Sequence, residues 1–417
     1  MLEKPAVRLL AAAWLVAAVA APVSITSATS TEARAFKVRL LLDNQRLRPD
    51  TSQPFDIESA PVIDGDYVVF STMDCCSVDA VWSINIKTKQ IVKLAGTDTP
   101  VPHGQGTFEN FNFTAPTVGG ELVAFSANNG NGIYTVPTKG GRIHRVIASR
   151  MKSPEGDRFE NFYGVSLNGA QVAFSALTDH GHHGIYQASV TGDGLVVLAN
   201  EKDKLATRKR CSFEPGSRLF NFDNPVIGAN VVAYNATGSG QPNNDPSGVA
   251  SAGILIADNL TRLPQDFADC PHLEFGRLSA PVQSDQVAFS ALDVDAHDPN
   301  TGIAFQGIFI ANGADKKATR LVTNAMKSPV NRQPFGVFSG FGFDQSGLAF
   351  TATELLGGQG VFFLAGPGDN IVNIAHDTDF HSPVVGDRSV SGGVVTFASN
   401  PTTGSGNSIW VATPILP

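Results

Sequence analysis

Two loops of this sequence concentrate side chains that bind metal ions. The first, SALTDHGHHGIY, places Asp179, His180, His182 and His183 within five residues. Imidazole and carboxylate groups together suit Zn, Mn, Cu or Ni. One interpretation is therefore part of a metal site that another repeat unit of the chain completes. The alternative is a solvated turn rich in His, because neither an H-E-x-x-H motif nor a helical spacing is present.

The second loop, SALDVDAHDPNTGIAFQGIF, holds Asp293, Asp295, His297, Asp298 and Asn300. Oxygen ligands at alternating positions are how a calcium loop starts. Asp293, Asp295 and Asp298 are thus predicted ligands of calcium or another hard divalent cation. The EF-hand pattern itself is not met, since its Gly and its final Glu are absent, and a plain Asx-turn loop is the alternative.

The four cysteines are Cys75, Cys76, Cys211 and Cys270. An even count in an exported chain permits disulfides. Cys211 and Cys270 lie in segments that leave consecutive repeat units, and we expect a disulfide between them. For the adjacent Cys75 and Cys76, a strained vicinal disulfide, a soft-metal site and reduced thiols all stay open.

The N-terminal residues read as a secretory signal peptide. Lys4 and Arg8 precede the apolar run Leu9–Val23, and Ala33-Arg34-Ala35 offers an A-x-A cleavage site, with Ala18-Val19-Ala20 as an earlier alternative. The run is short for a membrane-spanning helix, and no second apolar span follows, although an uncleaved anchor is the alternative. We predict that residues 1–35 are removed and that the mature protein is secreted or periplasmic, without membrane insertion.

Charge and motifs exclude several classes of function. The formal net charge of −8 makes nucleic acid and anionic membrane surfaces poor partners. The sequence also lacks a G-x-S-x-G elbow, a P-loop and a dinucleotide-binding glycine motif in the required context.

A phrase of the form v-a-F-s-a recurs seven times, at intervals of 47 to 61 residues. Such a period indicates a solenoid, a propeller or an array. The seven copies are Tyr67–Thr72, Leu122–Ala127, Gln171–Ala176, Val231–Ala236, Gln286–Ala291, Gly347–Ala352 and Val394–Ser399.

Each copy lies within a longer unit. An extended piece ending in a turn-forming dipeptide precedes it, and two further short runs follow, such as GIYTVP and RIHRVIAS. The unit therefore reads as four short antiparallel strands joined by hairpin turns, which is the pattern of a β-propeller blade. The aromatic residue at the fourth place of each copy, such as Phe125 or Phe174, should pack between adjacent blades.

The last unit has only three strands, and the predicted mature N-terminus begins with what looks like a fourth. FKVRLLLDNQRLRPDTSQPF matches the fourth strand and outgoing connector of other units, such as RIHRVIASRMKSPEGDRF. We predict that Lys37–Asp43 supplies the outer strand of the last blade. The predicted fold is an all-β, closed seven-bladed propeller over residues 36–417 as a single domain. A ring of six or eight blades and an open array are the alternatives.

The connectors, which are the segments that link one unit to the next, also share a sequence pattern. LAGTDTPVPHGQGTFENF has the form T-p-x-P-x-g-x-G-x-F-x-x-F, and the hairpin that follows ends in G-I-Y. This resembles a family of exported bacterial repeat proteins that are TolB-like in broad appearance. The resemblance implies a propeller fold and an exported location, and it brings no catalytic residues.

The missing catalytic motifs, together with long polar loops, favour a secreted, monomeric binding or scaffold module that holds a protein or a polysaccharide on its loop face. The alternative is a carbohydrate-active enzyme, a lyase or hydrolase, with a site at the channel mouth. Its candidate residues are His180, His182, His183, Asp293, Asp295 and His297. They belong to units three and five, so they share a site only if both loops lean over the channel. A structural module of a surface complex is a third possibility.

Overall fold

The computed structural model describes residues 35–57, 59–74, 77–109, 111, 115–127, 132–201, 219–238, 247–251, 254–258, 273–279, 285–297, 304–312, 318–400 and 407–415. Within these ranges the regular secondary structure is entirely β-strand. The described part of the chain has no helix that is long and apolar enough to cross a membrane. Residues 1–34 of the predicted signal peptide and all four cysteines lie outside the described residues, so the cleavage and the Cys211–Cys270 disulfide stay predictions.

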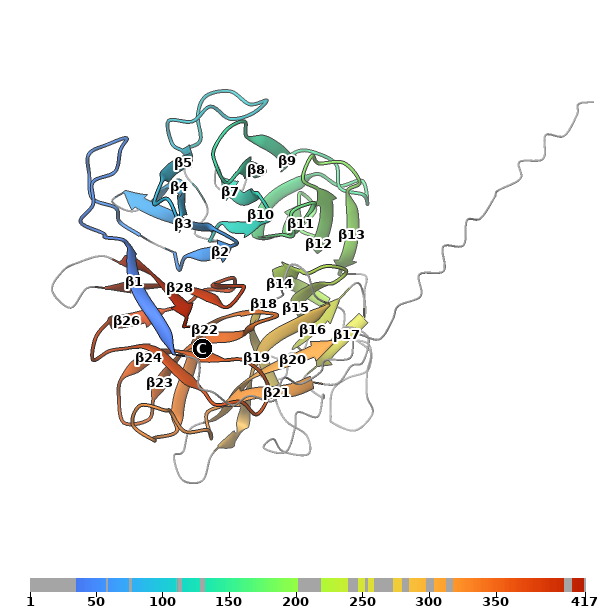
Figure 1. Cartoon of the computed structure of the whole chain (residues 1–417). Coiled ribbons are helices and arrows are strands. Elements are labelled where there is room, and N and C mark those ends of the chain that lie inside the picture. The colour runs from blue at the N-terminus through green and yellow to red at the C-terminus, as the bar shows by residue number, and fades with distance from the viewer. Residues whose placement is uncertain are drawn as a thin grey trace, which may run out of the picture. The chain divides into compact units, whose positions relative to one another are not determined.

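The strands form seven antiparallel sheets, which are the blades of a seven-bladed β-propeller (Figure 1). Blade 1 consists of β2 (Val62–Asp64), β3 (Tyr67–Asp74), β4 (Ser77–Asn85) and β5 (Ile91–Gly96). Blade 2 consists of β6 (Thr117–Gly119), β7 (Leu122–Ala127), β8 (Gly132–Pro137) and β9 (His144–Ala148). Blade 3 consists of β10 (Phe159–Leu167), β11 (Gln171–Thr178), β12 (His183–Ser189) and β13 (Val196–Asn200). Blade 4 consists of β14 (Leu219–Ile227), β15 (Val232–Gly238), β16 (Ser247–Ser251) and β17 (Ile254–Asp258). Blade 5 consists of β18 (Leu273–Ser279), β19 (Gln286–His297), β20 (Ala304–Asn312) and β21 (Ala318–Thr323). Blade 6 is β22 (Phe335–Asp344), β23 (Gly347–Glu354), β24 (Gln359–Leu364), β25 (Val372–His376), and blade 7 is β26 (His381–Val384), β27 (Val390–Ser391), β28 (Val394–Asn400), β29 (Ser408–Pro414) with β1 (Phe36–Leu42).

The first strand of each blade lies innermost, and in blade 7 β26 and β27 share this position, since both pair with β28. These inner strands contact one another in chain order, β2, β6, β10, β14, β18, β22 and β27, and β27 contacts β2 again. This succession closes the ring, which confirms the seven-bladed fold predicted from the repeats.

The N-terminal strand completes the last blade, as predicted. β1 pairs antiparallel with β29, from Phe36 opposite Pro414 to Leu42 opposite Ile409. In Figure 1, β1 in blue lies within the blade whose other strands are red. The pairing gives the outer edge of the last blade a strand from the other end of the chain, which covers hydrogen-bonding groups that would otherwise be exposed.

The repeated phrase forms the second strand of every blade, and its aromatic residue is buried. Phe125 stacks on Tyr134 of the third strand, with ring centroids 5.8 Å apart, and Phe108 of the connector meets Tyr134 edge-on at 4.9 Å. Phe125 also belongs to a core cluster that includes Val69 and Val81 of blade 1. The aromatic anchors therefore join neighbouring blades, because each core cluster draws on two of them.

Among the described residues, four of the connectors between blades fold into a similar small hairpin. Its closing hydrogen bond runs from Arg48 N to Gln53 O, from Ser153 N to Asp157 O and from Ser328 N to Gln333 O at 2.7 Å each, and from Val101 N to Gly106 O at 3.1 Å. The similar sequences of these connectors therefore reflect a similar backbone conformation. The connectors lie beside the loops between second and third strands, and we call the side of the ring that carries both the loop face.

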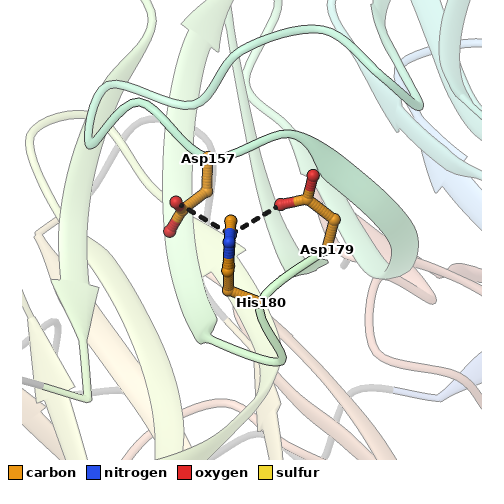
Figure 2. Close-up of side chains that lie close together, drawn as sticks. All are labelled: Asp157, Asp179 and His180. Carbon is orange, nitrogen blue, oxygen red and sulfur yellow. Dashed lines mark ion pairs between the residues drawn. The ribbon is translucent and has the colours of Figure 1, made fainter.

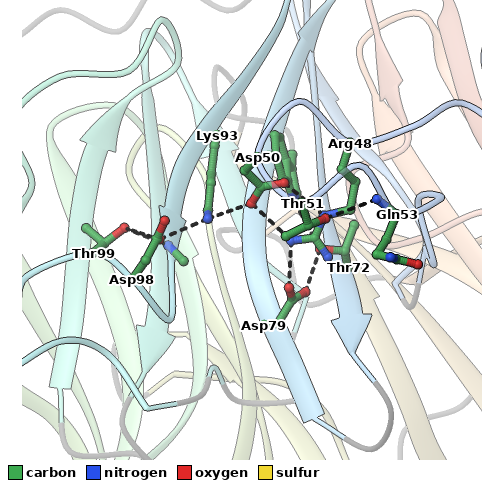
Figure 3. A network of polar contacts seen from close by, with 11 residues as sticks. Arg48, Asp50, Thr51, Gln53, Thr72, Asp79, Lys93, Asp98 and Thr99 are labelled. Carbon is green, nitrogen blue, oxygen red and sulfur yellow. Dashed lines mark hydrogen bonds and ion pairs between the residues drawn. The ribbon is translucent and has the colours of Figure 1, made fainter.

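The first connector hairpin is fastened to blade 1 by a network of charged side chains (Figure 3). Arg48 contacts Asp79 at 2.7 Å and Asp50 at 3.2 Å, and Lys93 contacts Asp50 at 2.6 Å. The Arg48 guanidinium also lies over the Trp82 ring, 5.4 Å from its centroid. Burial acts to raise the pKa of Asp50, but hydrogen bonds from Arg48 and Lys93 outweigh it and hold that pKa below its usual value. The network ties the segment that follows β1 to the ring.

Candidate metal centre

The loop between β11 and β12 is a tight turn stabilised by its own backbone. Thr178 N donates to His182 O at 2.9 Å, and Gly181 N donates to Thr178 O at 2.9 Å. Gly181 adopts a positive φ of 77°, which glycine reaches without steric cost. The turn projects His180 and His182 in parallel, and their ring centroids are 6.4 Å apart.

The third connector hairpin, between β9 and β10, packs against this turn. Asp179 N donates to Arg158 O at 2.8 Å, and Arg158 N donates to the Asp179 carboxylate at 3.1 Å. These two bonds bring Asp157, the neighbour of Arg158, beside the histidines. Asp157 was not predicted from the sequence as a site residue.

Asp157, Asp179 and His180 converge on one point (Figure 2). His180 Nδ1 lies 3.1 Å from Asp157 Oδ1 and 3.0 Å from Asp179 Oδ1. The three potential ligand atoms all lie within 4.8 Å of one another, and this is the one such group found among the described residues. His182 Nδ1 contacts the other oxygen of Asp157 at 3.1 Å.

The group is open to solvent. The side chain of His180 is 68% exposed, that of Asp179 is 43% exposed and that of Asp157 is 25% exposed. Carboxylate oxygen and imidazole nitrogen each bind a divalent metal at about 2.0–2.2 Å, so donors that lie about 3 Å apart can share one ion. Three protein ligands leave further coordination positions for water or a bound molecule. Without a metal, the same contacts are ion pairs whenever the histidines are protonated.

Blade 6 carries the same turn without the donors. Glu354 N donates to Gly358 O at 2.9 Å, Gly357 N to Glu354 O at 3.0 Å and Leu355 N to Pro334 O at 3.1 Å. These bonds match those of blade 3, so Leu355, Leu356 and Gly358 stand where blade 3 has Asp179, His180 and His182, and Gln333 stands where it has Asp157. The turn therefore folds without carboxylate or imidazole groups at these positions. This internal comparison of the two connectors is the signal that could have pointed to Asp157.

The other predicted ligands lie elsewhere. His183 begins β12, where its backbone N–H donates to Glu201 at 3.0 Å and its ring meets Tyr163 edge-on at 5.2 Å. Asp293 is buried within β19 of blade 5, and blade 4 separates it from the turn of blade 3. Asp295 follows in β19, and Asp298 lies outside the described residues. The structure thus brings His180 and His182 together with Asp157 and Asp179, and it places Asp293 and Asp295 on a different blade.

Comparison with known proteins gives the fold and no family. No family model and no curated protein matches the chain. Among solved structures, the oligogalacturonate lyase of Vibrio parahaemolyticus is similar with a TM-score of 0.53 and 11% identity, over 91% of this chain and 96% of that one. An oligogalacturonate lyase in complex with manganese has a TM-score of 0.53 and 8% identity, over 92% of this chain and 96% of that one.

The β-propeller domain of the Trilobed protease from Pyrococcus furiosus is similar with a TM-score of 0.51 and 9% identity, over 87% of this chain and 98% of that one. TolB proteins of Agrobacterium tumefaciens and Acinetobacter baumannii are also similar, with TM-scores of 0.38 and 0.35 at 12% and 11% identity. The likenesses with TM-scores above 0.5 show the propeller fold alone. Membership of a family of exported TolB-like repeat proteins stays a prediction.

Proposed function

We propose that the protein is an exported binding module, a single propeller domain over residues 36–417, that holds a divalent metal on its loop face and binds an acidic glycan through it. The observation that carries this proposal is the convergence of Asp157, Asp179 and His180. The equivalent turn of blade 6 folds without these donors, so their presence in blade 3 is not a requirement of the fold. A solvent-open group of this kind leaves room for a ligand beside the metal.

The donor set supports one class of metal. Imidazole suits Zn and carboxylate oxygens suit Mn, so the mixed donor set accommodates either ion, whereas calcium takes oxygen ligands only. We therefore assign a transition-metal ion to the group of blade 3, and calcium stays a prediction for the Asp293 to Asp298 loop.

The net charge supports the role of the metal in binding. A protein with a formal charge of −8 does not attract a polyanion by its overall field. A bound divalent cation supplies positive charge at one point and open positions for carboxylate oxygens. Uronate-containing glycans carry such carboxylates at regular spacing.

A second function is cleavage of the same class of glycan. His182 lies beside the group through its contact with Asp157, so an imidazole base would stand next to a metal-bound uronate. The similarity of the fold to oligogalacturonate lyases, one of them in complex with manganese, makes oligogalacturonate the first substrate to test.

Calorimetric titration of the purified protein with Mn²⁺ tests the metal site. We expect about one equivalent to bind to the wild type, and Asp157→Asn to weaken binding at least about tenfold, since a neutral amide oxygen replaces the charged carboxylate ligand. As a matched gain of function, Gln333→Asp with Leu355→Asp and Leu356→His installs the donors on the turn of blade 6 and should add a second equivalent. Wild-type protein that binds no Mn²⁺ or Zn²⁺ would overturn the proposal.

Co-sedimentation with polygalacturonate then tests the ligand. Binding should require Mn²⁺ and disappear with EDTA or with Asp157→Asn. Release of unsaturated oligosaccharides, seen by ultraviolet absorbance, would assign the lyase activity. Metal binding without glycan binding would refute the glycan and leave the metal site standing.

A further inference from the structure

A short segment of blade 7, between β26 and β27, reaches across the centre of the ring. The guanidinium of Arg388 donates from Nη1 to Val118 O at 3.0 Å and to Leu167 O, and from Nη2 to Ile227 O at 2.8 Å and to Ser166 Oγ at 3.1 Å. These four acceptors lie on β6, β10 and β14, the inner strands of blades 2, 3 and 4. One side chain thus bonds to three blades on the other side of the channel.

The backbone around Arg388 contacts blades 1 and 5. Ile63 N of β2 donates to Arg388 O at 2.8 Å, and the hydroxyl of Ser389 donates to Pro61 O at 3.0 Å. The hydroxyl of Ser279, at the end of β18, donates to Asp387 O.

Blade 6 approaches the same segment so closely that it needs glycine. A Cβ on Gly342 of β22 would lie 2.6 Å from Ser389 N and 3.0 Å from Gly386 O. Residues 386–389 therefore touch the innermost part of every other blade.

The setting keeps Arg388 charged. The residue is only 8% exposed, and burial lowers the pKa of its guanidinium to about 10, with Asp64 and Asp387 as nearby negative charges. It therefore carries its charge at neutral pH. A buried charge persists only where hydrogen bonds compensate for lost hydration, and the four acceptors supply this compensation.

We propose that Arg388 is a latch that completes the ring from the inside. The β1–β29 pairing joins the two ends of the chain at the rim, and Arg388 joins the last blade to blades 2, 3 and 4 at the centre. The two contacts act at opposite edges of blade 7. Without the latch, the inner end of that blade loses its bonds to half of the ring while the outer pairing persists.

Arg388→Met tests the latch, with Arg277→Met as a matched control. Arg277 contacts the same segment, through Asp387 at 3.4 Å, but its side chain is 54% exposed. We expect Arg388→Met to lower Tm by about 5 °C, because three carbonyl groups lose their partner, and Arg277→Met to lower it by less than about 1 °C.

Hydrogen exchange separates a latch from a general loss of stability. In Arg388→Met the amide of Ile63 and those of β27 should exchange at least tenfold faster, whereas the amides of β1 and β29 should keep their wild-type rates. Equal Tm and equal exchange in the Arg388→Met and Arg277→Met proteins would overturn the proposal.

Arg388→Lys covers the case in which Arg388→Met does not fold. A lysine keeps the charge but cannot reach all four acceptors from one compact ammonium group. Its Tm should fall between those of the wild type and a protein without the latch. Wild-type Tm and wild-type exchange in Arg388→Lys would show that the fork-shaped contact is not needed.

Discussion

Replacing Arg48 with Met removes the charge at the centre of the network on blade 1. The Arg48 side chain is 4% exposed, and its two carboxylate partners, Asp50 and Asp79, are 18% and 12% exposed. Methionine keeps apolar contact with Trp82, so the loss is mainly that of the charge and its hydrogen bonds. Lys93 still contacts Asp50, and Asp79 is left with the hydroxyl of Thr72 at 2.8 Å.

The expected cost follows from these contacts. Breaking a buried ion pair by removing one partner costs about 3–5 kcal/mol. Because Lys93 remains beside Asp50, we expect the lower end, about 3 kcal/mol in the free energy of unfolding. The entropy of unfolding is about 2.1 cal/mol/K per residue, or about 0.8 kcal/mol/K for a propeller of about 380 residues, so Tm should fall by about 4 °C.

Differential scanning calorimetry at neutral pH measures this shift. Lys87→Met is the control, because Lys87 pairs with Asp66 at 2.7 Å on the same blade but is 72% exposed. Exposed pairs contribute little, so the control should change Tm by less than about 1 °C. If Arg48→Met melts within 1 °C of Lys87→Met, the reasoning that this network fastens the first connector is wrong.

Two further predictions rest on described contacts. Hydrogen bonds to Lys93 and Arg48 hold the pKa values of Asp98 and Asp50 below their ordinary value of 3.8, so the stability that these carboxylates contribute is present above about pH 4 and is lost as pH falls through their lowered values. Tm measured against pH should therefore drop on acidification, and by less in Arg48→Met. Gly357 and Gly358 both have positive φ, at 103° and 97°, but a Cβ on Gly358 would lie 3.0 Å from His376 Cε1, whereas one on Gly357 meets nothing within 4 Å. Gly358→Ala should thus lower Tm more than Gly357→Ala does, because only the former presses on the buried contact between His376 and Glu354, and equal values would contradict this account.

The architecture could be predicted from the sequence because its causes are local and repeated. Each second strand needs the same buried aromatic, so Phe125 and Phe174 recur in the same phrase. The pairing of β1 with β29 was also predictable, since the last unit lacked a strand and the N-terminal segment matched one. Both inferences compare the sequence of one part of the chain with that of another, and neither requires a distance between atoms of the folded structure.

The site was only partly predictable for the opposite reason. His180 and His182 are conspicuous because they are close in sequence, whereas Asp157 joins them only through backbone bonds between a connector and a turn. Arg388 has no sequence signature at all, because its principal partners are backbone carbonyls, which every residue possesses. Contacts of this kind depend on how the ring closes, and the sequence pattern does not indicate which backbone groups are then brought together.

The pairing of β1 with β29 also sets an order of assembly. A ribosome produces β1 first, yet its partner strand is among the last to be made, and Arg388 also comes late. Blades 1 to 6 can each form from contiguous chain, whereas the seventh must wait for both ends. Until then β1 is an unpaired strand, which is a hazard for aggregation and also an open segment on which a chaperone or an export factor can act. The exported protein that we propose would gain time from such an arrangement, because its ring cannot close before the far end of the chain arrives.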